Sequence, residues 1–217
     1  MIKKILSFSL LLAFVLTINL TSFASKPLHD ISNEDIIKNG TLIKSDIYNI
    51  DGNEYRENVY IYTEEIPSSR NNEREFMQIA LSQISPTNIK LRYDLPAEDY
   101  QIDLKSIIYF ATGDATGYPG EKGYRLHRAI IKPAGTMPEL EYDYLTAWSM
   151  DPQTPNTPQT FSASGNGNFV RYLNFNGYSA DAPGGRVGTM FEYYYKGEYR
   201  VLSNFVVDQH IPTFSYL

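Results

Sequence analysis

The segment Phe191-Glu-Tyr-Tyr-Tyr-Lys-Gly-Glu-Tyr-Arg-Val201 decides the fold class, because it reads as a β-hairpin. Its centre is Lys196-Gly197, where glycine permits the positive φ of a tight turn, and aromatic residues flank the pair on both sides. Aromatic and β-branched side chains suit the pleated surface of a sheet. The segment therefore predicts antiparallel strands over residues 187–195 and 199–207.

Similar signals recur along the rest of the chain. Asp51-Gly52 separates two strand-like runs, 41–49 and 55–63, and predicts a second hairpin. Further strands are expected at residues 89–94, 105–112, 123–132, 140–149, 168–175 and 212–216. Short strands separated by turn residues, together with 18 tyrosines and 11 phenylalanines, are typical of mainly β proteins. We expect a single domain, residues 25–217, built as an antiparallel β-sandwich or barrel.

Two segments predict helices within this β framework. Residues 70–84 carry apolar side chains at three- and four-residue spacing, and Pro86 would end the helix; these side chains are Phe76, Met77, Ala80, Leu81 and Ile84. We expect this helix to pack on a sheet. A capping pattern at Ser32 and Asp35, with Asn39-Gly40 at the other end, predicts a short helix over 33–39. The polar, proline- or glycine-rich segments 151–167 and 176–186 predict long loops.

The N-terminus has the pattern of an export signal. Lys3 and Lys4 precede an uncharged run over residues 5–16, and Ser22-Phe23-Ala24 offers small residues for cleavage. This pattern predicts a signal peptide, residues 1–24, cleaved after Ala24, and a secreted protein. An uncleaved membrane anchor is the alternative, but the apolar run is short against the roughly 20 residues that a membrane span needs. The chain has no cysteine, which excludes disulfides and thiol chemistry.

Charge and missing motifs exclude several classes of function. The signal peptide contains two lysines and no acidic residue, so its removal changes the net charge from −6 to −8. An acidic surface repels phosphate, which argues against nucleic acid and anionic lipid as partners. The nucleophile-elbow, P-loop, dinucleotide-binding and zinc-protease motifs are all missing. With three histidines and no cysteine, we expect no metal site and no cofactor.

The expected strand 140–149 contains most of the candidate site residues. Alternation places Tyr142, Tyr144 and Trp148 on one face, where flat rings could stack against sugars. It places Glu141 and Asp143 on the other face. These two carboxylates, with Glu192, are candidate acids and bases of a glycosidase-like hydrolase. The aromatic residues fit a core face equally well, and the acidic residues fit a solvated strand face.

A second group of candidates lies in the expected strand 123–132. Alternation places Arg125 and His127 on one face. An arginine beside a histidine lowers the pKa of the imidazole, which would suit a neutral base or an anion site. The alternative is a charged strand face whose arginine pairs with nearby carboxylates.

The string Leu91-Arg-Tyr-Asp-Leu-Pro-Ala-Glu-Asp99 resembles the first catalytic segment of pertussis-toxin-like ADP-ribosyltransferases, in which an arginine binds the dinucleotide. The resemblance implies that Arg92 would have that role, followed by Ser162-Ala163-Ser164 and a catalytic Glu192. The sequence departs from the family because the second segment lies in a proline-rich loop and the interval to the glutamate is short. The match covers one short string.

The sequence therefore supports three functions, which we rank by how well the residues fit each one. The first is a secreted binding or accessory module that recognises carbohydrate, a cell-surface polymer or a protein partner, because tyrosine-rich strands occur without a complete catalytic motif. The second is a carboxylate-dependent hydrolase, which needs no short motif. The third is the transferase.

Overall fold

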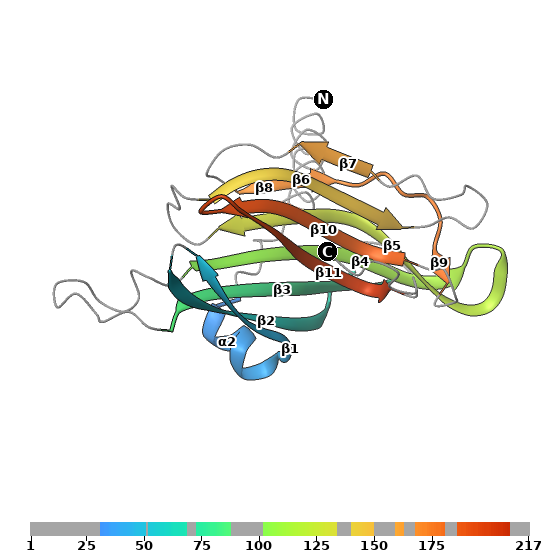
Figure 1. Cartoon of the computed structure of the whole chain (residues 1–217). Coiled ribbons are helices and arrows are strands. Elements are labelled where there is room, and N and C mark those ends of the chain that lie inside the picture. The colour runs from blue at the N-terminus through green and yellow to red at the C-terminus, as the bar shows by residue number, and fades with distance from the viewer. Residues whose placement is uncertain are drawn as a thin grey trace, which may run out of the picture. The chain divides into compact units, whose positions relative to one another are not determined.

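The computed structural model of the chain is shown in Figure 1. It describes residues 31–50, 52–68, 73–87, 102–133, 140–149, 159–162, 168–180 and 186–208. The chain divides into two compact units, Met1–Ser32 and Asn33–Leu217. All of the strands described below belong to the second unit.

Two antiparallel sheets form this unit (Figure 1). The seven-stranded sheet runs in the order β1 (Thr41–Ile50), β2 (Asn53–Ile66), β3 (Arg74–Pro86), β4 (Ile102–Ala115), β5 (Tyr118–Pro133) and β8 (Phe169–Tyr172), with β9 (Ser179–Ala180) also paired to β5. The four-stranded sheet runs β11 (Glu198–Asp208), β10 (Arg186–Tyr195), β6 (Leu140–Ser149) and β7 (Gln159–Ser162). The predicted mainly β fold is confirmed and is consistent with a sandwich, whereas the barrel alternative is wrong because the sheets do not close.

Both predicted hairpins are present. At the β10–β11 turn, Lys196 and Gly197 have φ angles of 50° and 76°. Both angles are positive, as a two-residue hairpin turn of this kind requires. At the β1–β2 turn, Gly52 has a φ of 79° and its N–H donates to the Asn49 side chain at 2.8 Å. The expected strands 89–94 and 212–216 lie outside the described residues, and β7 and β9 are short strands inside the two expected loops.

The predicted helix over residues 70–84 is wrong, because the part of it that the structure describes belongs to strand β3. β3 lies between β2 and β4 and is buried on both faces. Ala80 and Ile84 face the other sheet, whereas Met77, Ile79 and Leu81 alternate with them on the opposite face. A strand buried on both sides is an unbroken apolar run, which periodicity alone cannot separate from a helix.

The short predicted helix is confirmed as α2 (Asn33–Asn39). It lies on the face of the seven-stranded sheet that is turned away from the four-stranded sheet (Figure 1). Its Ile36 is fully buried, and the Asn33 amide donates to the Asp103 carboxylate on β4. No helix in the described ranges is long and apolar enough to cross a membrane.

The main core fills the space between the two sheets. Its fully buried side chains include Ile108, Leu126, Leu145, Phe191 and Leu202. A buried polar network crosses this core, in which Asn204 of β11 bonds to Gln78 of β3 and to the backbone of Ser106 on β4. A buried amide without a hydrogen-bond partner destabilises the folded protein, so this network fixes β11 against β3 and β4 of the larger sheet.

Candidate functional site

A β-bulge in β6 changes which of the predicted site residues on this strand share a face. Glu192 of β10 pairs with Tyr144 and Tyr193 pairs with Tyr142, so Asp143 is the extra residue. Tyr142 therefore points into the core, where it packs edge-on against Phe191 at 5.2 Å, and burial raises its pKa to about 12. Tyr144 points outward with 43% of its surface exposed. The expected aromatic row with Tyr142 and Tyr144 on one face does not form.

Beyond the bulge, the outer face of the four-stranded sheet carries a group that we call the tyrosine face. Tyr144, Tyr194 and Tyr199 are 43%, 37% and 47% exposed. The tyrosine face comprises Glu141, Tyr144, Glu192, Tyr194 and Tyr199. Glu141, Tyr194 and Tyr199 pair in one row across three strands, and Glu192 pairs with Tyr144 in the next. Residues paired in this way lie about 4.5–5.5 Å apart at Cα, so each carboxylate lies at contact distance from a tyrosine.

Trp148 lies on the same outer face but is held by its neighbours. Its ring packs against Phe205 at 5.7 Å, across the position of Gly188. The Arg186 guanidinium covers both rings, 4.3 Å from the Trp148 centroid and 4.5 Å from that of Phe205. Trp148 is therefore half-buried and supports the face as a fixed element.

The structure places Arg125 and His127 on β5, in the other sheet. Arg125 binds both carboxylate oxygens of Glu73 at 3.1 and 3.0 Å and lies over the ring of Tyr178. His127 is the extra residue of a bulge in β5, and its carbonyl accepts a bond from the Leu173 N–H at 3.0 Å. Arg125 thus has the ion pair expected of a charged strand face.

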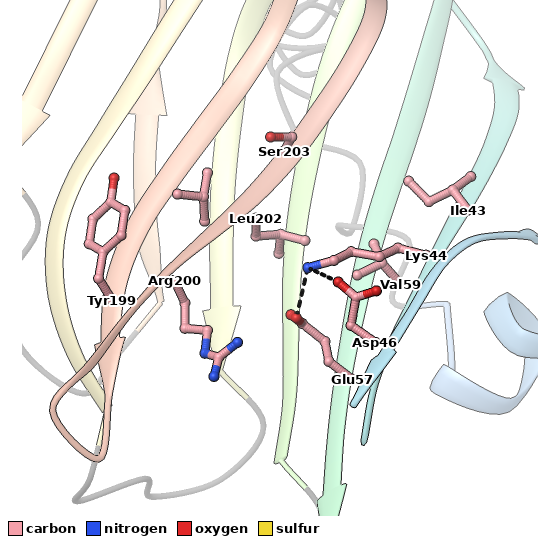
Figure 2. Close-up of a pocket in the computed structure, with 10 residues that line it drawn as sticks. Ile43, Lys44, Asp46, Glu57, Val59, Tyr199, Arg200, Leu202 and Ser203 are labelled. Atoms are coloured by element: carbon pink, nitrogen blue, oxygen red, sulfur yellow. Dashed lines mark hydrogen bonds and ion pairs between the residues drawn. The ribbon is translucent and has the colours of Figure 1, made fainter. Parts of the chain in front are cut away.

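An open cleft lies beside the tyrosine face (Figure 2). It exists because β1 and β2 continue the larger sheet past β11, the edge of the smaller sheet, which packs on β3 and β4. The volume of the cleft is about 580 Å³. Its lining consists of Ile43, Lys44 and Asp46 of β1, Glu57 and Val59 of β2, and residues Tyr199 to Ser203 of β11.

One wall of the cleft carries a buried carboxylate. Glu57 is 2% exposed and accepts bonds from Lys44 at 3.1 Å and from the Ser82 hydroxyl at 2.8 Å. Lys44 also pairs with Asp46 at 3.2 Å. Burial acts to lower the pKa of Lys44, but the charge and hydrogen bond of Glu57, helped by Asp46, outweigh it and raise the pKa. Lys44 therefore stays charged and pairs with both carboxylates of this wall, which keeps one negative charge in excess.

The opposite wall carries Arg200. Its guanidinium stacks on the Tyr48 ring with only 3.4 Å to the centroid. Its Nε and the Tyr48 hydroxyl are both buried and have no hydrogen-bond partner among the residues that the structure describes. Burial raises the pKa of Tyr48, so its hydroxyl keeps its proton and can donate.

Sequence reasoning did not single out Glu57, Lys44 or Arg200. One signal was available, because the register of the Asp51-Gly52 hairpin places Asp46 opposite Glu57. The approach of Arg200 to Tyr48 depends on how the two sheets pack, which no local pattern records. The described ranges contain no group of three His, Cys, Asp or Glu residues arranged to hold a metal ion.

The chain matches no protein-family model, no curated protein and no solved structure. The tyrosine face and the cleft are therefore the basis for assigning a function.

Proposed function

We propose that this protein is a secreted binding module whose tyrosine face holds a carbohydrate polymer. The observation that supports this most directly is the composition of the face, three exposed tyrosines with Glu141 and Glu192 beside them. Neither carboxylate makes a hydrogen bond or ion pair with another residue in the described part of the chain. Groups without partners of their own are available to a ligand.

The chemistry of this face suits a sugar. The C–H side of a sugar ring is apolar and stacks on an aromatic ring, while its hydroxyls need polar partners, which the carboxylates supply. Tyrosine loses little conformational entropy on binding because it has few rotatable bonds. Tyr194 and Tyr199 already restrict each other, with ring centroids 5.7 Å apart. The face is also continuous across three strands, since β6, β10 and β11 are neighbours in one sheet, which suits an extended polymer.

Retention on immobilised polysaccharides tests the proposal. The full-length mature protein is passed over a panel of plant, fungal and bacterial polysaccharides, and variants are compared on any polymer that retains it. We expect Tyr144→Ala and Tyr199→Ala each to weaken retention about tenfold, the equivalent of about 1.4 kcal/mol. Tyr172→Ala is the matched control, because Tyr172 is 76% exposed but lies on β8 of the other sheet. Retention that survives loss of all three face tyrosines would overturn the proposal.

The same panel separates the hydrolase from the binding module. Glu141 and Glu192 lie on an open face, and Asp143 occupies the bulge, so no feature of the described residues favours catalysis by this group. A hydrolase would release sugar products and lose that release in Glu141→Gln or Glu192→Gln. For the transferase, Arg92 lies outside the described residues. Ser162 on β7 and Glu192 on β10 both pair with Tyr144, which lies on the strand between them. Consumption of NAD would identify that activity.

Export is part of the proposal and has its own test. We expect the protein recovered from the medium of its host to begin at Ser25, following cleavage after Ala24. N-terminal sequencing or intact mass checks this. A protein that stays inside the cell with Met1 attached would contradict it.

A further inference from the structure

We infer that the cleft between β1, β2 and β11 is a subsite for an anionic group, carried by a sugar of the polymer that the tyrosine face binds. This inference rests on the proposed function and narrows its ligand to a carbohydrate that bears a carboxylate or a phosphate.

The charges of the cleft lead to this ligand class. Of the two cations that line it, Lys44 is held by Glu57 at 3.1 Å and by Asp46 at 3.2 Å. Arg200 has neither an ion pair nor a hydrogen bond with any residue in the described ranges. The lining holds two cations and two carboxylates, and Arg200 is the cation that has no carboxylate within ion-pair distance among the described residues. A guanidinium without an ion pair favours an anionic group as its ligand.

The geometry of Arg200 favours a planar or tetrahedral anion in particular. Its fork of N–H donors matches two oxygens of a carboxylate or phosphate. Stacking on Tyr48 at 3.4 Å fixes the plane of the fork before a ligand arrives, so little entropy is lost on binding. In Figure 2 the guanidinium of Arg200 extends from β11 on the side of the cleft opposite Lys44 and Glu57.

Strand β11 makes the cleft continuous with the tyrosine face. Side chains alternate along it, so Tyr199 points outward and the neighbouring Arg200 points inward. Tyr199 belongs to both surfaces, since it pairs with Tyr194 on the face and also lines the cleft. A polymer lying across the three tyrosines therefore reaches the edge of β11 and can place one sugar in the cleft. A volume of about 580 Å³ is within the range of small-molecule sites.

The acidic surface of the protein does not oppose this. The mature chain carries a net charge of −8, but at physiological ionic strength charges are screened beyond about 8 Å. Contacts inside the cleft act at shorter range, where Arg200 can meet an anion directly while Lys44 holds both carboxylates of the lining at 3.1 and 3.2 Å.

A matched pair of ligands tests the inference. An oligosaccharide that ends in one uronic acid and the same oligosaccharide with that carboxyl group reduced to an alcohol differ only in the anion, and binding is measured by calorimetry. We expect the native protein to bind the acidic form at least tenfold more tightly. Inorganic phosphate as competitor identifies the source: competition at low millimolar concentration assigns the site to phosphate-bearing sugars, and its failure assigns the site to carboxylates.

Variants locate the effect. In Arg200→Gln the affinities for the acidic and the reduced form should become about equal, and the affinity for the reduced form should not change. Arg200→Lys should keep part of the preference for the acidic form. Arg56→Gln is the control, because Arg56 is exposed on β2 outside the cleft lining. Thermal unfolding confirms that each variant is folded. A preference that persists in Arg200→Gln, or a native protein without preference, overturns the anion subsite and leaves the proposed function standing. Loss of binding to both forms in Tyr144→Ala tests the proposed function separately.

Discussion

The amide of Asn204 joins the two sheets, and its removal should weaken the whole sandwich. Asn204 is fully buried on β11. Its amide donates to the Ser106 carbonyl at 2.7 Å and to the Gln78 carbonyl at 3.3 Å, and its oxygen accepts from the Gln78 amide at 2.9 Å. Asn204→Ala removes all three bonds and leaves buried polar groups behind. β11, which carries Tyr199 and Arg200, would lose its polar anchor.

The size of the effect follows from these three bonds. Each intramolecular hydrogen bond contributes a net 0.5–1.5 kcal/mol, so their loss costs about 3 kcal/mol. That is a large fraction of the roughly 5–15 kcal/mol that stabilises a typical domain. With a urea m value of about 2 kcal/mol per molar, the unfolding midpoint should fall by about 1.5 M. Trp148 is the only tryptophan, so its fluorescence reports the transition without ambiguity.

Ser45→Ala provides the matched control. The Ser45 hydroxyl bonds to the Asn58 side chain at 2.8 Å, but this pair is exposed, and its loss should cost less than about 0.5 kcal/mol. Gln78→Ala combined with Asn204→Ala should cost less than the sum of the single changes, because the two side chains share a bond. If Asn204→Ala lowers stability no more than Ser45→Ala does, the network does not hold the sheets together.

Two further predictions concern alkaline pH and a glycine on the outer face. Burial raises the pKa of Tyr142 to about 12, against about 10 for tyrosine in an unfolded chain, so its contribution to stability is complete below pH 10 and is lost as the pH rises toward 12. Urea unfolding at pH 9 and pH 11 should therefore show a smaller loss in Tyr142→Phe than in the native protein, and equal losses would contradict the assignment. Gly188→Ala should destabilise the protein by about 1–3 kcal/mol or more, since the added methyl group meets the Phe205 ring and the Asn204 carbonyl, whereas the exposed Thr160→Ala should change stability by less than about 0.5 kcal/mol.

Local sequence was sufficient for the hairpins and insufficient for β3. The turns at Asp51-Gly52 and Lys196-Gly197 depend on the φ angle of a glycine, which is a local property. The apparent helical spacing of β3 arose because Gln78 and Ser82 interrupt an apolar strand that is buried on both faces. These polar residues are buried because Asn204 and Glu57 supply hydrogen bonds from distant parts of the sequence. No window around residue 78 contains that information.

The candidate site was predictable in composition and not in geometry. Tyr144, Glu141 and Glu192 were identified from strand-like sequence, and the structure brings them together on one face. The bulge at Asp143 turns Tyr142 inward, and such a bulge is set by pairing with β10 rather than by the sequence of β6 alone. Tyr194 and Tyr199 complete the face only because the strands lie side by side.

The charges of the cleft also explain why the two sheets do not close there. Among the strands that the structure describes, β1 and β11 each end their sheet with an unpaired edge, and unpaired edges tend to pair with any strand in reach. Pairing across the cleft would remove the charged side chains of Arg200 and Asp46 from water, and no carboxylate of the described residues lies within ion-pair distance of Arg200 to offset that cost. Inward-pointing charges of this kind protect sheet edges. The same side chains therefore keep the cleft open and give it the polar lining that a charged sugar would require.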